Sequence, residues 1–210
     1  MKPASKGTVY VIDDDEAVRD SLQWLLEGND YRVRCFDSAE AFLTRFDPRE
    51  VACLIVDVRM PGMSGLELQD RLIQRGVNMP LAFITGHGDV PIAVATMKKG
   101  AIDFIEKPFD EVRLLASIRQ GVELTRQTKT EAAELDELQA RFDNLSTRQR
   151  EVMELAVAGL SSKEIGIRLN ISPKTVENHR AWVMERIGAR NVADLIRKAM
   201  KIRSHKERLR

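Results

Sequence analysis

The chain has 210 residues, of which 43% are hydrophobic and 31% are charged. Its apolar runs are shorter than the roughly 20 residues that a membrane span needs, and no signal-type apolar segment opens it, so we expect a soluble cytoplasmic protein. The net charge of +1 divides into −5 over residues 1–124, −2 over 125–144 and +8 over 145–210. This division favours two domains with different partners, the basic one being the candidate for binding a polyanion.

Five short apolar strands alternate with amphipathic helices through residues 1–124. The predicted strands are Thr8–Ile12, Tyr31–Phe36, Ala52–Val56, Leu81–Ile84 and Ala101–Ile105. Strands that are apolar on both faces are typical of a parallel sheet covered by helices on each side. Cys35 and Cys53 lie in such runs, and we expect both to be small core residues. The five βα units predict a flavodoxin-like α/β fold whose ligands bind beyond the carboxyl ends of the strands.

Residues 125–144 are predicted to form a helical linker. The sequence has no proline from Asp110 to Phe142, and apolar residues such as Leu135 and Leu138 keep helical spacing. We expect the last helix of the first domain to continue through the linker, solvated or lightly coiled against a second copy. A flexible linker is the alternative, although its usual glycine and proline residues are missing.

Residues 145–210 are predicted to form a small all-helical domain of four short helices. Two capping boxes mark helix starts, one from Ser146 to Gln149 and one from Ser161 to Glu164. Pro173 suits the first turn of a third helix.

Polar residues lie at the carboxyl ends of four predicted strands in the first domain. They are Asp13, Asp14, Asp57, Thr85 and Lys107. These ends converge in a parallel sheet, so three carboxylates, a hydroxyl and an ammonium should share one crevice. Such a carboxylate cluster suits Mg²⁺. One carboxylate can then attack a phosphoryl group, while the metal and Lys107 neutralise charge and Thr85 donates a hydrogen bond.

The segments VIDDD, LIVDVRMPGMSG, ITGHGD and DFIEKPF resemble the receiver domain of bacterial two-component response regulators, and the run GHGDVPIAVATMKKGAIDFIEKPF resembles its FixJ-type branch. The resemblance implies that Asp57 accepts the phosphoryl group. It also implies that Asp14 binds Mg²⁺ directly, Asp13 binds it through water, and Arg59 contributes its backbone carbonyl. Lys107 would pair with the phosphoryl group and precede a cis Pro108.

Thr85 and Phe104 match the switch pair of the same family. The resemblance implies that the Thr85 hydroxyl moves toward the phosphoryl group and the Phe104 ring follows it inward. A plain core aromatic is the alternative for Phe104. His87 has no partner at ligand spacing, so we expect it not to be a metal ligand.

The stretch SSKEIGIRLNISPKTVENHRAWVMERI predicts a helix, a tight turn and a second helix. At 100° per residue, Glu177, Asn178, Ala181 and Glu185 lie opposite the apolar stripe of the second helix, where side chains can reach base edges in a major groove. Four further residues are candidates for holding phosphates: Lys163, Lys174, Thr175 and Arg180.

Residues 145–200 also resemble the LuxR/FixJ-type output domain, through the segment LSTRQREVMELAVAGLSSKEIGIRLNISPKTVENHRAWVMERIGARN. The resemblance implies that Thr175–Ile187 is the recognition helix and that the helix from Val192 is a dimerisation surface. Glu177 departs from the family, since related domains often carry Lys there.

The two resemblances together imply a phosphorylation-dependent transcriptional regulator. A sensor histidine kinase would phosphorylate Asp57, which would promote homodimerisation and binding to promoter DNA, with RNA polymerase as a further candidate partner. Catalysis would be limited to self-phosphorylation and autodephosphorylation at Asp57. One alternative is a Mg²⁺-dependent phosphohydrolase of the haloacid dehalogenase type, although Arg59 stands where that class needs an acid. Another is a phosphate sink or adaptor that does not bind DNA.

Overall fold

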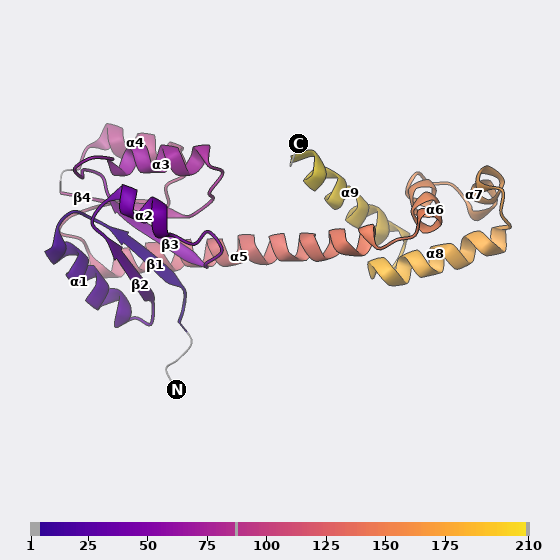
Figure 1. The fold of residues 1–210 in the computed structure, drawn as a ribbon, viewed down its shortest axis with the longest axis horizontal. Helices are drawn as coiled ribbons and strands as arrows, with labels where there is room; N and C mark the ends of the chain where they lie inside the picture. Colours follow the sequence, from indigo (N-terminus) through magenta and orange to yellow (C-terminus); the bar gives the residue numbers. More distant parts are fainter. Residues whose placement is uncertain (1–4, 87, 209–210) are drawn as a thin grey trace. The chain divides into compact units, whose positions relative to one another are not determined.

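The computed structural model describes residues 5–86 and 88–208, so the expectation for His87 lies outside the described residues. The chain forms two compact units, Met1–Lys129 and Thr130–Arg210 (Figure 1). Each helix in the described ranges is too short or too polar to cross a membrane.

The first unit is built on a parallel sheet of five strands. The strands are β1 (Thr8–Ile12), β2 (Arg32–Phe36), β3 (Ala52–Asp57), β4 (Leu81–Thr85) and β5 (Asp103–Glu106). They lie in the order β2-β1-β3-β4-β5, which places β1 and β3 side by side at the centre. This topology confirms the predicted flavodoxin-like fold.

Two apolar clusters join the sheet to its helices. One cluster packs α1 (Glu16–Glu27) and α5 (Glu111–Asp143) against the sheet. The other packs α2 (Ala39–Arg45), α3 (Gly65–Gln74) and α4 (Val90–Lys98) against it. Alternate residues of each strand face opposite clusters, as with Val9 and Tyr10 in β1, because successive side chains point to opposite faces of a sheet.

The strand bounds differ from the predicted ones by one or two residues. β5 begins at Asp103 rather than Ala101, because the Ala101 amide closes the end of α4 by donating to the Thr96 carbonyl at 3.1 Å. β2 begins one residue later than predicted, whereas β3 and β4 each extend by one residue. Asp57 and Thr85 are therefore the last residues of their strands.

All of the predicted linker, residues 125–144, except its last residue lies within a single helix, α5, which has 33 residues and ends at Asp143. Its first part belongs to the sheet unit, since the Thr125 hydroxyl donates to the Ala52 carbonyl at 2.6 Å and Lys129 Nζ donates to the Pro48 carbonyl at 2.8 Å. Its last turns pack Leu135 and Phe142 into an apolar cluster of the second unit. Between these two anchored ends most residues of the helix are exposed, and the expectation of a solvated or intermolecularly coiled linker stays a prediction. The functional boundaries at residues 124 and 144 stay a prediction.

The second unit is completed by four helices: α6 (Thr147–Val157), α7 (Ser162–Leu169), α8 (Pro173–Ile187) and α9 (Val192–Arg208). The capping boxes predicted at Ser146 and Ser161 are present. Asn170 ends α7 in the left-handed conformation, with φ of 52°, so that the chain can turn sharply into α8. Buried contacts between Ile165 and Val176 hold α7 against α8.

Candidate functional site

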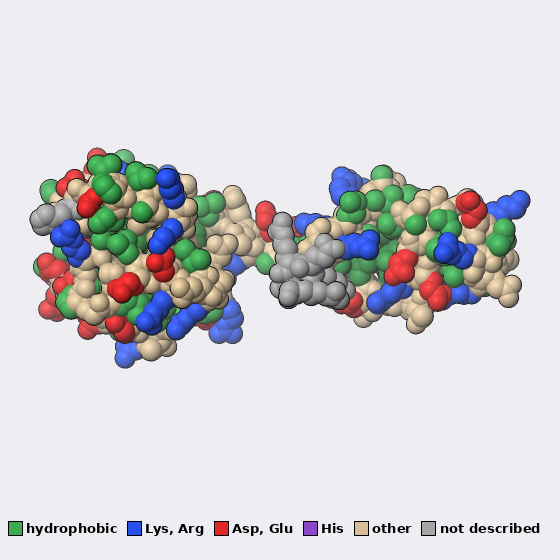
Figure 2. Space-filling view, turned by 90° about the horizontal axis from the view of Figure 1, so that it is seen from above, with side chains coloured by type: hydrophobic (Ala, Val, Ile, Leu, Met, Phe, Trp, Pro, Cys, Tyr) green, Lys and Arg blue, Asp and Glu red, His purple; other side chains and the backbone are tan. Residues whose placement is uncertain are grey.

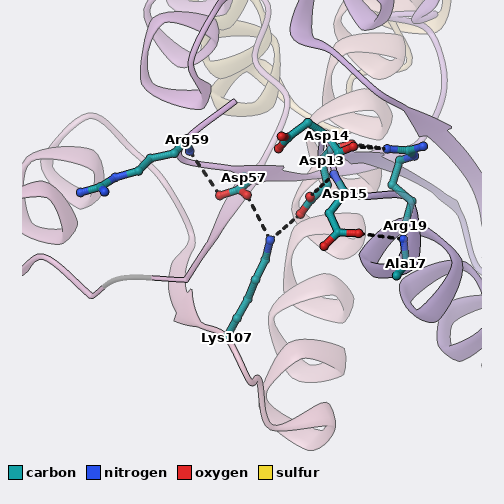
Figure 3. Close-up of polar contacts among 8 residues, drawn as sticks. All are labelled: Asp13, Asp14, Asp15, Ala17, Arg19, Asp57, Arg59 and Lys107. Carbon is teal, nitrogen blue, oxygen red and sulfur yellow. Dashed lines mark hydrogen bonds and ion pairs between the residues drawn. The ribbon is translucent and has the colours of Figure 1, made fainter. Parts of the chain in front are cut away.

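The acidic residues predicted to converge do so at the carboxyl ends of β1 and β3 (Figure 3). Asp13, Asp14 and Asp57 each present a carboxylate oxygen within 4.8 Å of the others. Asp13 is fully buried and Asp57 is 8% exposed, whereas Asp14 is open to solvent. Two carboxylates therefore form the floor of the crevice, and the third stands at its mouth.

Lys107 reaches into this cluster from the segment that follows β5. Its Nζ lies 2.6 Å from Asp13 Oδ2 and 3.0 Å from Asp57 Oδ2. Its backbone amide donates to the Thr85 carbonyl at 2.7 Å, which ties the lysine to the end of β4. The Lys107–Pro108 peptide is cis, as predicted.

Burial and ion pairing have opposite effects on the pKa values of Asp13 and Lys107. Desolvation raises the pKa of Asp13, although hydrogen bonds from Lys107 and from the Asp15 amide oppose that rise. Desolvation alone would lower the pKa of Lys107, but its hydrogen bonds to Asp13 and Asp57 outweigh it and raise that pKa. Lys107 therefore stays a cation at neutral pH.

The donor set fits a hard divalent cation. Its ligand atoms would be carboxylate oxygens, and Mg²⁺ typically takes one or two carboxylates together with water and phosphate oxygens. The single positive charge of Lys107 leaves the three carboxylates undercompensated. Asp14, which is exposed at the mouth, is the carboxylate that a hydrated ion can reach most directly.

The other predicted pocket residues lie around Asp57. The Arg59 amide donates to Asp57 Oδ1 at 3.2 Å, while the Arg59 side chain is exposed and points away from the cluster (Figure 3). Thr85 ends β4 and is 1% exposed. Phe104 is half-buried, with its ring centroid 6.2 Å from that of Phe83. Metal binding by the Arg59 carbonyl and switching by Thr85 and Phe104 stay predictions.

Sequence reasoning missed two contacts that hold the loops around Asp57. Arg19 Nη1 donates to the carbonyls of Asp13 and Asp14. Glu106 Oε1 accepts a hydrogen bond from the Gly88 amide at 3.1 Å, in the loop after β4. Each of these residues lies close to a motif in the sequence, and that was the only signal for it. A side chain that bonds to a backbone group can reach any residue type, so no characteristic residue spacing marks the contact.

The predicted nucleic-acid surface lies on α7 and α8 of the second unit. Glu177, Asn178 and Ala181 are exposed on α8, and Lys163 is exposed on α7. Lysine and arginine side chains lie around the face of this unit drawn in Figure 2. The surface has the exposed basic groups that phosphate contacts require.

Four of the predicted DNA-contacting side chains already have partners within the second unit. Lys174 Nζ lies 3.6 Å from Glu177 Oε2, and Thr175 Oγ1 lies 2.8 Å from Ser172 Oγ. Arg180 is half-buried, and its Nη1 donates to Ser162 Oγ at 3.4 Å. These contacts are exposed or long, so they leave the side chains able to exchange partners.

Two family models match this chain, one in each of the two units. The model for the response regulator receiver domain matches residues 9–119. The model for bacterial regulatory proteins of the luxR family matches residues 143–199.

Similar full-length proteins extend this result. The chain is 44% identical over 197 residues to the transcriptional regulatory protein FixJ of Bradyrhizobium diazoefficiens, an alignment that covers 94% of this chain and 96% of that protein. The structure of full-length FixJ from B. japonicum aligns with 95% of this chain and 98% of that one, at 43% identity and a TM-score of 0.56. The structure of the response regulator StyR aligns with 92% of this chain and 98% of that one, at 41% identity and a TM-score of 0.83.

Proposed function

Because the chain belongs to the FixJ-like two-component response regulators, transcriptional regulators with a receiver domain and a LuxR-type DNA-binding domain, we propose that phosphorylation of Asp57 controls its binding to promoter DNA. A sensor histidine kinase is the donor. The single observation that carries the proposal is the contact of one ammonium, Lys107 Nζ, with both buried carboxylates of the acidic cluster.

In the phosphorylation step, an Asp57 carboxylate oxygen attacks the phosphorus atom and forms an acyl phosphate. The bond from phosphorus to the donor atom breaks, and the donor leaves with that electron pair. Lys107, which lies 3.0 Å from Asp57 Oδ2, is placed to neutralise charge on the transferred group. Attack by water on the same phosphorus reverses the modification, so catalysis by this chain is limited to its own phosphorylation and dephosphorylation.

Asp13, Asp14, Asp57 and the carbonyl of Arg59 would hold Mg²⁺. The ion supplies positive charge at the phosphoryl oxygens when it is bound. Burial of Asp13 and its contact with Lys107 keep one side of the cluster fixed, and the exposed Asp14 remains open to the incoming group.

The switch couples this pocket to α4 and β5. The Thr85 hydroxyl turns toward the phosphoryl group, and the Phe104 ring moves inward from its half-buried position. This movement reshapes a surface on which α4 exposes Val90, Val94 and Met97. Two phosphorylated chains pair through that surface, and a dimer joins two weak half-site contacts into one stronger binding event.

The output domain binds promoter DNA with α8 in the major groove. Asn178, Ala181 and Glu177 face the bases, while Lys163, Lys174, Thr175 and Arg180 hold phosphates. RNA polymerase is a further partner, and the cytoplasm is the place of action.

The test is binding of promoter fragments by the full chain, with and without acetyl phosphate and Mg²⁺. We expect wild type to bind more tightly with the donor, and Asp57→Asn to be indifferent to it. Asp136→Asn, at an exposed position of α5, is the matched control and should respond like wild type. Equal responses from wild type and Asp57→Asn would overturn the proposal.

Two further readouts separate the alternatives. DNA binding should weaken steeply with salt, because lysine and arginine contacts to phosphate release counterions. An adaptor that does not bind DNA would show no such dependence, and a phosphohydrolase would turn over external phosphomonoesters.

A further inference from the structure

The side chain of Arg19 contacts the backbone of the acidic loop that carries Asp13 and Asp14. It lies in the first turn of α1, and its Nη1 donates to the Asp13 carbonyl at 2.8 Å and to the Asp14 carbonyl at 3.0 Å (Figure 3). One guanidinium nitrogen therefore ties down two consecutive peptide groups, and each of these peptide groups follows a carboxylate of the cluster.

We propose that Arg19 is a positioning residue for the divalent cation, acting through the backbone of Asp13 and Asp14. The inference rests on the proposed function, because it assumes that the acidic cluster binds Mg²⁺. The inference adds Arg19 to the residues of the proposed metal site, although Arg19 itself offers no ligand atom to the metal.

The geometry of the loop supports this role. The Asp15 amide donates to Asp13 Oδ1 at 3.0 Å, and Asp15 Oδ1 accepts from the Ala17 amide at 2.9 Å to cap α1. These contacts fix the end of the loop nearest the helix. Arg19 adds a restraint on the carbonyl side, so the Asp13 and Asp14 carbonyls are held by α1 while a carboxylate oxygen of each remains within 4.8 Å of Asp57.

The restraint matters most for Asp14. Asp13 is fully buried and bonded to Lys107, whereas Asp14 is exposed. An exposed carboxylate on a free loop must lose conformational entropy when it binds an ion, and a backbone held in advance reduces that loss. Groups that orient metal ligands in this way influence affinity strongly without touching the metal.

Charge gives a second reason. Arg19 brings a permanent positive charge to the acidic loop, but it bonds to carbonyl oxygens and leaves the carboxylates free. Lys107, by contrast, bonds to Oδ2 of both Asp13 and Asp57, which are oxygens that a metal could use. Arg19 can therefore relieve repulsion in the cluster without competing for its ligand atoms.

The test is metal binding by the full chain, with Mn²⁺ as the probe. Electron paramagnetic resonance of free Mn²⁺ gives the dissociation constant, and competition with Mg²⁺ checks that both ions use one site. We expect Arg19→Met, which keeps the length of the stem and removes the donors, to weaken binding by about tenfold. Arg19→Lys, which restores a charged donor, should stay within about threefold of wild type. Arg119→Met, at an exposed position of α5, is the matched control and should bind like wild type.

A purely structural role would give a different result. In that case Arg19→Met would lower the free energy of unfolding and leave Mn²⁺ binding equal to that of Arg119→Met, which would overturn the inference. Should Arg19→Met fail to fold, Arg19→Gln keeps a neutral amide donor on a shorter stem and should bind several-fold more weakly than wild type. Binding of Arg19→Gln equal to that of wild type would likewise overturn the inference.

Phosphorylation by acetyl phosphate offers a second readout. In Arg19→Met the Mg²⁺ concentration for half-maximal phosphorylation should rise about tenfold, while the rate at saturating Mg²⁺ stays near that of wild type. The metal titration uses neither a phosphoryl donor nor DNA, so it succeeds or fails independently of the proposed switch. If wild type binds no Mn²⁺, the proposed metal site fails; if wild type and Arg19→Met bind it equally, the Arg19 inference alone fails.

Discussion

The helices of the receiver differ in how firmly they are packed: α1 and α5 are closely packed on one face of the sheet, whereas α4, on the opposite face, is largely exposed. The face under α1 and α5 is closed by fully buried side chains such as Leu22, Leu26, Leu114 and Ile118. On the opposite face, Thr96 is the residue of α4 that is buried among those the structure describes. The apolar residues Val90, Val94 and Met97 of the same helix are 74%, 48% and 44% exposed.

Polar contacts supplement the limited apolar packing of α4, in which half-buried Ile92 lies against the core. Gln69 Nε2 donates to the Thr96 carbonyl at 3.2 Å, and Lys99 pairs with Asp70. At the other end of α4, Glu106 accepts the amide of Gly88. Contacts of this kind each contribute little, because water replaces them when they break.

The difference teaches how one small domain can be both stable and switchable. Buried residues on both faces of the sheet hold the fold, while the largely exposed α4 can rearrange at a small cost in free energy. The proposed switch uses Thr85 and Phe104, which belong to the strands next to α4.

The strongest test of this comparison is a pair of truncations. Leu114→Ala removes a fully buried side chain of α5 and should lower the free energy of unfolding of the receiver by about 2–5 kcal/mol. Val94→Ala, on the exposed side of α4, should change it by less than about 0.5 kcal/mol. Urea unfolding followed by circular dichroism measures both, and equal losses would refute the contrast between α5 and α4.

A second prediction concerns Gln69, which is 5% exposed and whose Oε1 has no hydrogen-bond partner in the described part of the chain. Gln69→Met should stabilise the receiver by about 1 kcal/mol, because an unsatisfied buried oxygen is costly. The Thr96 carbonyl stays satisfied, since it also accepts from the amides of Lys99 and Ala101.

The same substitution removes one of the polar contacts that hold α4, so the response of DNA binding to acetyl phosphate should be at least as large as that of wild type. Gln74→Met, at an exposed position of α3, is the control and should leave both stability and response unchanged. A loss of stability in Gln69→Met would show that the hydrogen bond from Gln69 to Thr96 outweighs the orphaned oxygen.

A third prediction concerns pH, at the contact between β5 and α5. Desolvation acts to raise the pKa of Asp103, but hydrogen bonds from Arg113 and Ser117 prevail and lower it below its usual 3.8. A lowered carboxyl pKa stabilises the fold above the usual value and stops doing so as pH falls through the native value.

Asp103→Asn should therefore cost less than about 1 kcal/mol at pH 7, and the cost should shrink as the pH falls below about 3.8. Urea titrations across this range check the sign, with Asp136→Asn as the control. A cost that grows toward low pH would show that the native pKa is raised instead.

The smallest expected effect concerns Cys53, whose thiol should not react with thiol reagents in the folded chain. Its thiol is fully buried against the α1 and α5 side, and burial raises its pKa to about 12. In a Cys35→Ala variant, a thiol-reactive disulfide should label the folded chain no faster than it unfolds. Fast labelling under native conditions would show that this face opens more readily than its packing indicates.

The sequence by itself determined the features that depend on local pattern. Alternation of apolar strands and helices predicted the parallel sheet, and capping motifs predicted the starts of α6 and α7. The convergence of Asp13, Asp57 and Lys107 followed from their positions at strand ends, because parallel strands end at one edge of the sheet. These features need only neighbouring residues and a known topology.

The tertiary structure alone decided the contacts between side chains and distant backbone. The predicted linker became part of two units because Thr125 bonds to Ala52 and Phe142 enters a core of the second unit. The Arg19 contacts and the orphaned oxygen of Gln69 were equally hidden. A carbonyl acceptor is present at every residue, so a sequence does not mark which one a long side chain will reach; the packing of the folded chain decides it.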